Sequence, residues 1–282
     1  MAQILWLASF PKSGNTWLRA FLANYLRGGR LPEDINKLPE FSYGDMRIEY
    51  YEQISGKKGV DLGYDEINKL RPRVHRFLAG AQPGLVMVKT HSHLSIIDEV
   101  PTITPDVTFG AVYVVRNPLD VAVSFGHHYG LSTEAAVKAI CFKGLETVPQ
   151  TGHILQVLSD WSSHLKGWLD APGLYLHQMR YEDMTRSPTK TFGGVLEFLK
   201  IPKDRERLKR AIRHSSFNVL AGQERQSGFV ERSKSAEKFF RQGEIGGWRK
   251  ELTSEHVDFI IHHHREAMTK MGYLSADGEL RV

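Results

Sequence analysis

Four short apolar runs along the chain alternate with longer segments in which apolar residues recur at helical spacing. The runs cover residues 4–9, 85–89, 109–115 and 174–179, and each is apolar enough to be buried on both faces. Strands that alternate with helices are typical of a parallel sheet flanked by helices. The pattern therefore predicts an α/β fold with a central parallel sheet, and we expect one domain over residues 1–282.

The segments between the runs show the spacing or the end signals of helices. The predicted helices are residues 16–26, residues 118–128, residues 152–169 and a segment that begins after Ser187 and ends before Pro202. Asn117 suits the cap of the second helix and Pro118 its first position. Residues 28–63 and 222–247 look irregular, and we expect lids over a bound acceptor at about 28–80 and 222–247.

Composition narrows the class of protein. Hydrophobic residues make up 41% and charged residues 24% of the 282 positions, which are ordinary globular values. Cys141 is the single cysteine, so an internal disulfide is excluded and a reducing compartment such as the cytoplasm is expected. No apolar run approaches the about 20 residues that span a bilayer. The net charge of +5 suits a nucleic acid, a membrane surface or an anionic small ligand equally well.

The residues after the first run form a candidate anion site. Residues 10–17 read Phe-Pro-Lys-Ser-Gly-Asn-Thr-Trp and connect a predicted strand to a predicted helix. Such a loop presents backbone N–H groups and a helix N-terminus to an anion. The usual nucleotide-binding loop places its lysine after the glycines, whereas Lys12 precedes Gly14 here. A tight polar turn without a ligand is the alternative interpretation.

A cation and a possible base follow the second run. Side chains alternate along a strand, so Lys89 and His91 are expected on the same side, at the carboxyl edge where open α/β sheets bind ligands. A surface lysine and a capping histidine remain the alternative. Arg116 ends the third run, and its guanidinium fork can bind two phosphate oxygens. An ion pair with Asp120 is the alternative role for this arginine.

Together with the glycine-punctuated segment 239–248, these motifs resemble the cytosolic-type sulfotransferases, from residue 4 to about 248. That family moves the sulfuryl group of 3′-phosphoadenosine 5′-phosphosulfate (PAPS) to an acceptor and releases 3′,5′-diphosphoadenosine (PAP). The resemblance implies a strand–loop–helix site like a P-loop, PAPS as donor, no metal, and a hydroxyl of a small molecule, possibly carrier-bound, as acceptor. In-line displacement with a histidine base would be the mechanism.

The resemblance also implies roles for individual residues. His91 corresponds to the general base, Lys89 to a stabiliser of the transferring group, and Lys12 to a catalytic contact with the phosphosulfate. The donor would be bound by Lys12, Ser13, Gly14, Asn15, Thr16, Trp17, Arg116, Ser124, Tyr181, Ser215, Phe217, Arg241, Gln242 and Gly243. The chain departs from the family where Gln242 replaces a lysine and Gly247 an aspartate. The family's dimerisation pattern is not recognisable after Glu251, so the oligomeric state stays open.

Two other functions compete with this interpretation. A P-loop phosphotransferase using ATP would need magnesium and an acidic residue at a strand end, and none of the four runs ends in one. A module that binds nucleic acid would spread its lysines and arginines along one face, whereas here they recur at predicted strand ends. We therefore expect a small-molecule acceptor, no nucleic acid and no membrane span.

Overall fold

The computed structural model describes residues 3–147 and 152–282, which form two compact units. Each unit is assembled from segments far apart in the sequence. The first consists of Met1–Phe10, Ser42–Tyr113 and Phe142–Gln178. The second consists of Pro11–Phe41, Val114–Cys141 and Met179–Val282. In the part of the chain that is described, no helix is both long enough and apolar enough to cross a membrane.

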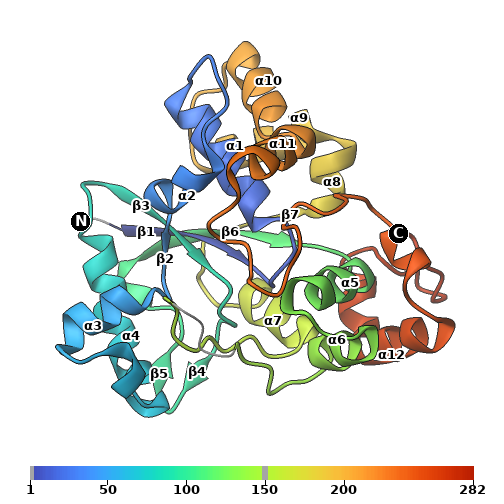
Figure 1. Cartoon of the computed structure of the whole chain (residues 1–282), viewed down its shortest axis with the longest axis horizontal. Helices are drawn as coiled ribbons and strands as arrows, with labels where there is room; N and C mark the ends of the chain where they lie inside the picture. Colours follow the sequence, from blue (N-terminus) through green and yellow to red (C-terminus); the bar gives the residue numbers. More distant parts are fainter. Residues whose placement is uncertain (1–2, 148–151) are drawn as a thin grey trace. The chain divides into compact units, whose positions relative to one another are not determined.

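A five-stranded sheet forms the centre of the first unit (Figure 1), and it confirms the predicted α/β fold. Its strands, in spatial order, are β2 (Tyr43–Gly44), β3 (Leu85–Thr90), β1 (Gln3–Ser9), β6 (Thr108–Val115) and β7 (Leu176–Arg180). β1 pairs with β3 in parallel, with Gln3 opposite Leu85. β7 was expected to be buried on both faces, but most of it is only half-buried because it forms an edge of the sheet.

The first unit contains more helix than the sequence predicts. Its helices are α3 (Ile48–Ser55), η2 (Gly59–Asp61), α4 (Tyr64–Ala79), η3 (Pro105–Val107) and α7 (Trp161–Leu169), and a hairpin of β4 (Ile96–Ile97) and β5 (Val100–Pro101) accompanies them. The expectation that residues 28–63 are irregular is therefore wrong for α3. This helix is short, and its buried contact is Tyr51, so the sequence gives it little periodic signal.

The helix predicted over residues 152–169 is only partly formed. It begins at Trp161, after Asp160, whose side chain accepts a hydrogen bond from the backbone N–H of Ser163. Ser159 has a φ of 58°, which a helix does not accommodate. Ile154 and Leu158 are buried as predicted, but in an extended segment whose N–H groups bond to other loops. The helical spacing of these apolar residues therefore reflects their burial in the tertiary structure and does not indicate a helix.

Apart from the ends of β6 and β7, the named secondary-structure elements of the second unit are helices joined by loops. Its elements are α1 (Asn15–Arg27), η1 (Ile35–Lys37), α2 (Leu38–Phe41), α5 (Pro118–Tyr129), α6 (Thr133–Ile140), α8 (Tyr181–Arg186), α9 (Pro188–Phe198), α10 (Arg205–His214), α11 (Phe217–Ser227), η4 (Gly247–Lys250) and α12 (Ser254–Lys270). Asn117 caps α5 as predicted, through the N–H of Leu119. Ser187 precedes α9 as predicted but makes no cap hydrogen bond with its side chain.

Two groups of helices within the second unit are visible in Figure 1. α5, α6 and α12 pack together, and α1 packs against α10, which also contacts α9. Arg207 of α10 donates to the carbonyls of Tyr25 and Leu26 at the end of α1. The Arg207 guanidinium satisfies two carbonyls that have no partner within the helix, and its charge favours the negative end of α1. α1 is thereby fixed at its far end, which in turn fixes the loop that precedes it.

Candidate active site

The loop between β1 and α1 lies in the second unit, and two of its residues have left-handed backbones. Lys12 has a φ of 66° and Gly14 a φ of 110°. A Cβ on Gly14 would lie 2.8 Å from Cδ2 of Tyr181, so both the backbone and the neighbouring ring require glycine. α1 begins at the next residue, Asn15. The loop therefore presents a helix N-terminus, where backbone N–H groups favour an anion.

Two buried polar atoms, one in this loop and one in the first turn of α1, fit a group that carries phosphate. Ser13 is 1% exposed, and within the described residues its Oγ has no hydrogen-bond partner. Nε1 of Trp17 is also buried and has no hydrogen-bond partner among the described residues. A buried polar atom without a partner is costly, and a ligand with acceptor oxygens would satisfy both atoms. Asn15 and Thr16, which are expected in the same site, are buried in the first turn of α1.

Aromatic side chains gather beside the loop. The rings of Trp17 and Tyr181 meet edge to face, 5.6 Å apart, and the guanidinium of Arg116 lies 4.2 Å from the centre of the Tyr181 ring. The Tyr181 hydroxyl donates to the carbonyl of Gly243 at 3.1 Å. A Cβ on Gly243 would come within 2.4 Å of the Phe217 ring, so this position also needs glycine. Three predicted adenine contacts are thus brought to one place.

Arg116 links the loop to the segment 239–248. Its Nη1 donates to the carbonyl of Lys12 at 3.3 Å, and its Nη2 donates to the carbonyl of Glu244 at 3.0 Å. Ser124 lies about two turns along α5 and is half-buried. The side chain expected to bind the 3′-phosphate is therefore already directed between two loops that carry other predicted donor contacts.

The beginning of the segment 239–248 is held by a carboxylate that sequence reasoning missed. Glu224 of α11 accepts from the backbone N–H groups of Phe239 and Phe240, at 2.7 and 2.9 Å. The Phe239 ring then lies 3.8 Å from Nζ of Lys12, measured to the ring centre. A cation over an aromatic face is attracted by the ring quadrupole. Glu224 thus helps to position the Phe239 ring against the ammonium group of Lys12.

Asp120 holds the other end of this segment. It is 4% exposed, and its two oxygens accept from the backbone N–H groups of Gly246 and Trp248, at 2.9 and 3.1 Å. A carboxylate in the first turn of α5 also suits the positive end of that helix. From the sequence alone, the role suggested for Asp120 was an ion pair with Arg116. Its observed bonds give it the role of an anchor for the glycine-rich segment.

The two positions that depart from the family lie next to each other. A Cβ on Gly247 would come within 3.4 Å of Oε1 of Gln242. The neighbouring Arg241 forms an ion pair with Glu251 at 2.8 Å, and His127 contacts the other oxygen of the same carboxylate at 2.7 Å. Glu251 therefore holds Arg241 toward α5, and it is a second carboxylate that the motif analysis did not single out.

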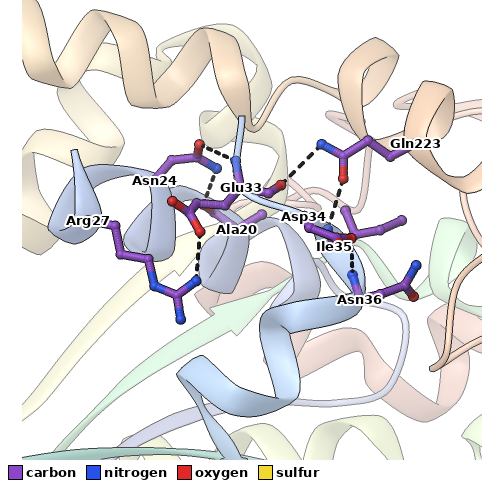
Figure 2. Close-up of polar contacts among 8 residues, drawn as sticks. All are labelled: Ala20, Asn24, Arg27, Glu33, Asp34, Ile35, Asn36 and Gln223. Atoms are coloured by element: carbon purple, nitrogen blue, oxygen red, sulfur yellow. Dashed lines mark hydrogen bonds and ion pairs between the residues drawn. The ribbon is translucent and has the colours of Figure 1, made fainter. Parts of the chain in front are cut away.

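Both expected lid segments contain fixed hydrogen bonds in the second unit, and Figure 2 shows one network. The Gln223 side chain on α11 donates to the carbonyl of Glu33 and accepts from the N–H of Ile35, at 3.1 and 2.8 Å. The Asn36 side chain accepts from the N–H of Val230 at 2.9 Å. The beginning of the first segment is thus fastened to α11 and to the second segment.

The first unit contains the predicted base. Nδ1 of His91 lies 2.8 Å from the carbonyl oxygen of Ser9 and 3.2 Å from its hydroxyl. A carbonyl oxygen can only accept, so Nδ1 carries the proton in this contact. The lone pair of the neutral ring is then on Nε2. A histidine that is held in this tautomer has the electronic form of a general base.

The alternation expected along β3 is observed. Thr90 is buried, whereas Lys89 and His91 are half-buried on either side of it. His93 lies in the loop that follows, as expected, and burial lowers its pKa below the ordinary value. Lys12 follows Ser9 by three positions in the chain. Lys89 and His91 belong to the first unit, and the predicted donor contacts belong to the second.

A buried aspartate, Asp45, forms hydrogen bonds with Lys89 and Thr90 at the end of β3. Asp45 is 2% exposed, and it accepts from the Thr90 hydroxyl at 2.6 Å. Burial raises the pKa of Asp45 to about 6, although the Thr90 hydrogen bond and the charges of Arg71 and Lys89 lower it in part. No motif pointed to this residue. In the sequence it is a single acidic residue between Gly44 and Met46, directly after the two-residue strand β2.

We expect Asp45→Asn to change how stability depends on pH. Because the folded pKa is raised, the protonated form of Asp45 contributes stability that is fully present below about pH 4 and is lost as the pH rises from there through about 6. The shift from 3.8 to about 6 corresponds to about 3 kcal/mol. In urea denaturation between pH 4.5 and 7.5, the free energy of unfolding of Asp45→Asn should increase relative to that of the wild type as the pH rises.

Asp61→Asn is the matched control, because Asp61 is exposed in the same unit. The free energy of unfolding of Asp61→Asn should differ from that of the wild type by a constant amount over the same pH range. A constant difference for Asp45→Asn as well would contradict the raised pKa.

Known proteins resemble this chain over most of its length. A family model described as the sulfotransferase domain matches residues 3–272, and the chain therefore belongs to that family. It is a PAPS-dependent sulfotransferase. Sulfotransferase 1A1 of Mus musculus is 26% identical over 274 residues, covering 93% of this chain and 84% of its own length. The Rattus norvegicus protein of the same name is 24% identical, covering 94% and 84%.

Solved structures share the fold. Mouse sulfotransferase SULT7A1 complexed with PAP is 20% identical, has a TM-score of 0.62, and the match covers 98% of this chain and 86% of that one. Retinol dehydratase in complex with androsterone and the inactive cofactor PAP is 19% identical, with a TM-score of 0.66 and coverage of 99% and 82%. These likenesses confirm the predicted α/β fold.

The structure thus brings most predicted donor contacts together within the second unit. Ser215 differs from the other predicted donor contacts, because its buried hydroxyl donates to the Ala211 carbonyl at the end of α10. Over the described ranges, no cluster of three or more His, Cys, Asp or Glu side chains could hold a metal ion. The residues that sequence reasoning missed are the carboxylates that hold the loops. Carboxylates and backbone N–H groups far apart in the sequence leave no local pattern.

Proposed function

We propose that this enzyme transfers the sulfuryl group of PAPS to a hydroxyl of a small-molecule acceptor, with His91 as the general base. The observation that carries the proposal is the contact of His91 Nδ1 with the Ser9 carbonyl, which leaves the lone pair on Nε2. An acceptor hydroxyl must lose its proton as its oxygen attacks sulfur. The bond from sulfur to the bridging oxygen of the donor breaks in the same step, and PAP leaves.

The second unit supplies the donor contacts in this proposal. Ser13, with its buried hydroxyl, and Lys12 would hold the phosphosulfate, while Arg116 and Ser124 would hold the 3′-phosphate. Arg241, Gln242 and Gly243 would close over the same phosphate. Trp17 and Tyr181 would frame the adenine, together with Phe217 and the neighbouring Ser215.

The acceptor would be a partly apolar alcohol or phenol, free or attached to a carrier. Retinol and androsterone, the ligands of the retinol dehydratase structures, both carry a hydroxyl. Tyr43 and Tyr50 of the first unit, in the expected lid of residues 28–80, are half-buried and suit such a ligand. Tyr51 and Phe229, which also lie in the expected lid segments, are buried and serve as core residues instead. A reducing compartment, the cytoplasm, remains our proposal because Cys141 is the single cysteine.

The donor role of Arg116 can be measured with two sulfuryl donors. Wild-type enzyme should transfer 35S from PAPS to an alcohol or phenol much faster than from adenosine 5′-phosphosulfate, which lacks the 3′-phosphate. Arg116→Ala should lose most of this preference, on the order of 10²-fold in kcat/KM, because a bidentate contact with a phosphate is strong. The measurement is the ratio of kcat/KM for the two donors over a panel of hydroxyl acceptors.

Arg186→Ala is the matched control, since Arg186 is an exposed arginine at the end of α8 in the same unit. It should keep the wild-type ratio. An Arg116→Ala enzyme with the full preference for PAPS would show that the 3′-phosphate is bound elsewhere. Absence of label in every acceptor, with PAPS intact, would contradict the proposed reaction itself.

A further inference from the structure

Two side chains of α7 hold the backbone of the residues that carry the predicted base. His164 and Trp168 are one turn apart, and both are fully buried. Nε2 of His164 lies 3.0 Å from the carbonyl oxygen of His91, and Nε1 of Trp168 donates to the carbonyl of Ser92 at 3.0 Å. One face of this helix therefore fixes two consecutive carbonyls at the end of β3.

The tautomer of His164 follows from its partners. The His91 carbonyl can only accept, so Nε2 of His164 carries the proton, and Nδ1 accepts from the Tyr113 hydroxyl at 2.8 Å. Burial lowers the pKa of His164 to about 3, so the ring is neutral at any pH at which the enzyme would work. Both ring nitrogens are satisfied, and the ring has no alternative orientation that keeps both bonds.

The backbone N–H of His91 is also held. With its amide oxygen turned toward the strand end, Gln156 accepts from the N–H groups of His91 and Ser92, each at 3.1 Å. His91 is thus bound at its N–H by Gln156, at its carbonyl by His164, and at its ring by Ser9. Three separate segments of the first unit determine where Nε2 of His91 lies.

We propose that His164 is a positioning residue for sulfuryl transfer, which acts by holding the His91 backbone so that Nε2 is presented to the acceptor hydroxyl. The inference rests on the proposed role of His91 as the base. His164 itself touches neither substrate nor the transferred group in this role. A displacement of about 1 Å at a catalytic group can lower a rate about 10²-fold, so the loss of this contact should affect turnover more than binding.

The test compares substitutions along this chain of hydrogen bonds. His164→Phe removes both bonds and keeps a ring, His164→Gln keeps a side-chain N–H that can reach the His91 carbonyl, and Tyr113→Phe removes one hydroxyl. Trp168→Phe is the matched control, because it removes the bond to the adjacent Ser92 carbonyl from the same buried face. Circular dichroism and thermal melting identify any variant that does not fold, and Tyr113→Phe then carries the test because it deletes a single oxygen.

Turnover would be measured with PAPS and three acceptors of falling pKa: benzyl alcohol, phenol and 4-nitrophenol. His164→Phe should lower kcat about 30-fold or more for the alcohol and much less for 4-nitrophenol, because an acidic phenol needs less help from a base. KM for PAPS should stay within about twofold. His164→Gln should recover most of the lost rate. Trp168→Phe should lower all three rates equally, if at all.

A second readout does not depend on the acceptor. Nitrogen-15 NMR of labelled histidines reports which nitrogen of His91 carries the proton, with the signal identified by its loss in His91→Ala. Wild type should show the Nδ1–H form, and His164→Phe, or Tyr113→Phe if the former does not fold, should show a mixture of forms. An unchanged His91 tautomer and an unchanged dependence on acceptor pKa in these variants would overturn the inference. If His91→Ala itself keeps its turnover, the proposed function fails instead.

Discussion

His91→Ala is expected to abolish sulfuryl transfer to alcohols while leaving the affinity for PAP nearly unchanged. An aliphatic hydroxyl has too high a pKa to ionise before it attacks, so its proton must move to a base in the transition state. A neutral imidazole is suited to this near pH 7 and contributes about 10²–10⁴ in rate. The Nδ1 contact of His91 with Ser9 already selects the tautomer that accepts through Nε2.

The measurement is kcat for labelled PAPS with the best alcohol of the acceptor panel, alongside calorimetric titration with PAP. The loss should be smaller for acidic phenols. His262→Ala is the matched control, because His262 is an exposed histidine of α12. A His91→Ala enzyme that keeps more than about a tenth of the wild-type rate would refute this base. His93 and His127 would then be the next candidates, the latter through its contact with Glu251.

Lys12→Ala should lower kcat by about 10²–10³-fold, the second large effect that we expect. The bridging oxygen of the donor gains negative charge as its bond to sulfur breaks, and a fixed cation at that oxygen stabilises the transition state more than the bound donor. The left-handed backbone of Lys12 and the nearby Phe239 ring hold this ammonium in place. Alanine retains the Cβ, so the strain at φ 66° is the same in wild type and variant.

Single-turnover measurements with labelled PAPS would separate this effect on chemistry from slow product release. Lys12→Ala should show a slow chemical step with a thermal midpoint close to that of wild type. Lys190→Ala, which removes an exposed lysine of α9 in the same unit, is the control and should behave as wild type. Turnover of Lys12→Ala near the wild-type rate would exclude the lysine from the transition state.

The sequence predicted those elements whose signals are local. The strands at residues 4–9 and 109–115 are runs of mostly buried apolar residues, and the helices that follow them begin at short-range signals, such as Asn117 before Pro118. The loop at residues 10–17 was recognisable for the same reason, since its cation, hydroxyls and glycine are adjacent in the chain. In the second unit the contacts of Arg116 with the Lys12 and Glu244 carbonyls bring two of these motifs together.

The helix expected over residues 152–169 shows where local reasoning stops. Ile154 and Leu158 repeat at helical spacing, yet they are buried in an extended segment, because its backbone N–H groups find partners in other loops. The edge position of β7 and the helix α3 were likewise not predictable, because sheet order and short-helix packing depend on which distant segments meet.

By itself the sequence determined the α/β class, and it predicted the phosphate-type loop and the residues that we propose bear the chemistry, because each is written in consecutive or evenly spaced positions. Only the tertiary structure decided how those residues are held. Glu224 and Asp120 fix the glycine-rich segment by its backbone, and His164 fixes the carbonyl of His91. A backbone N–H or carbonyl is the same at every residue, so its partner is selected by the fold and leaves no pattern in the sequence.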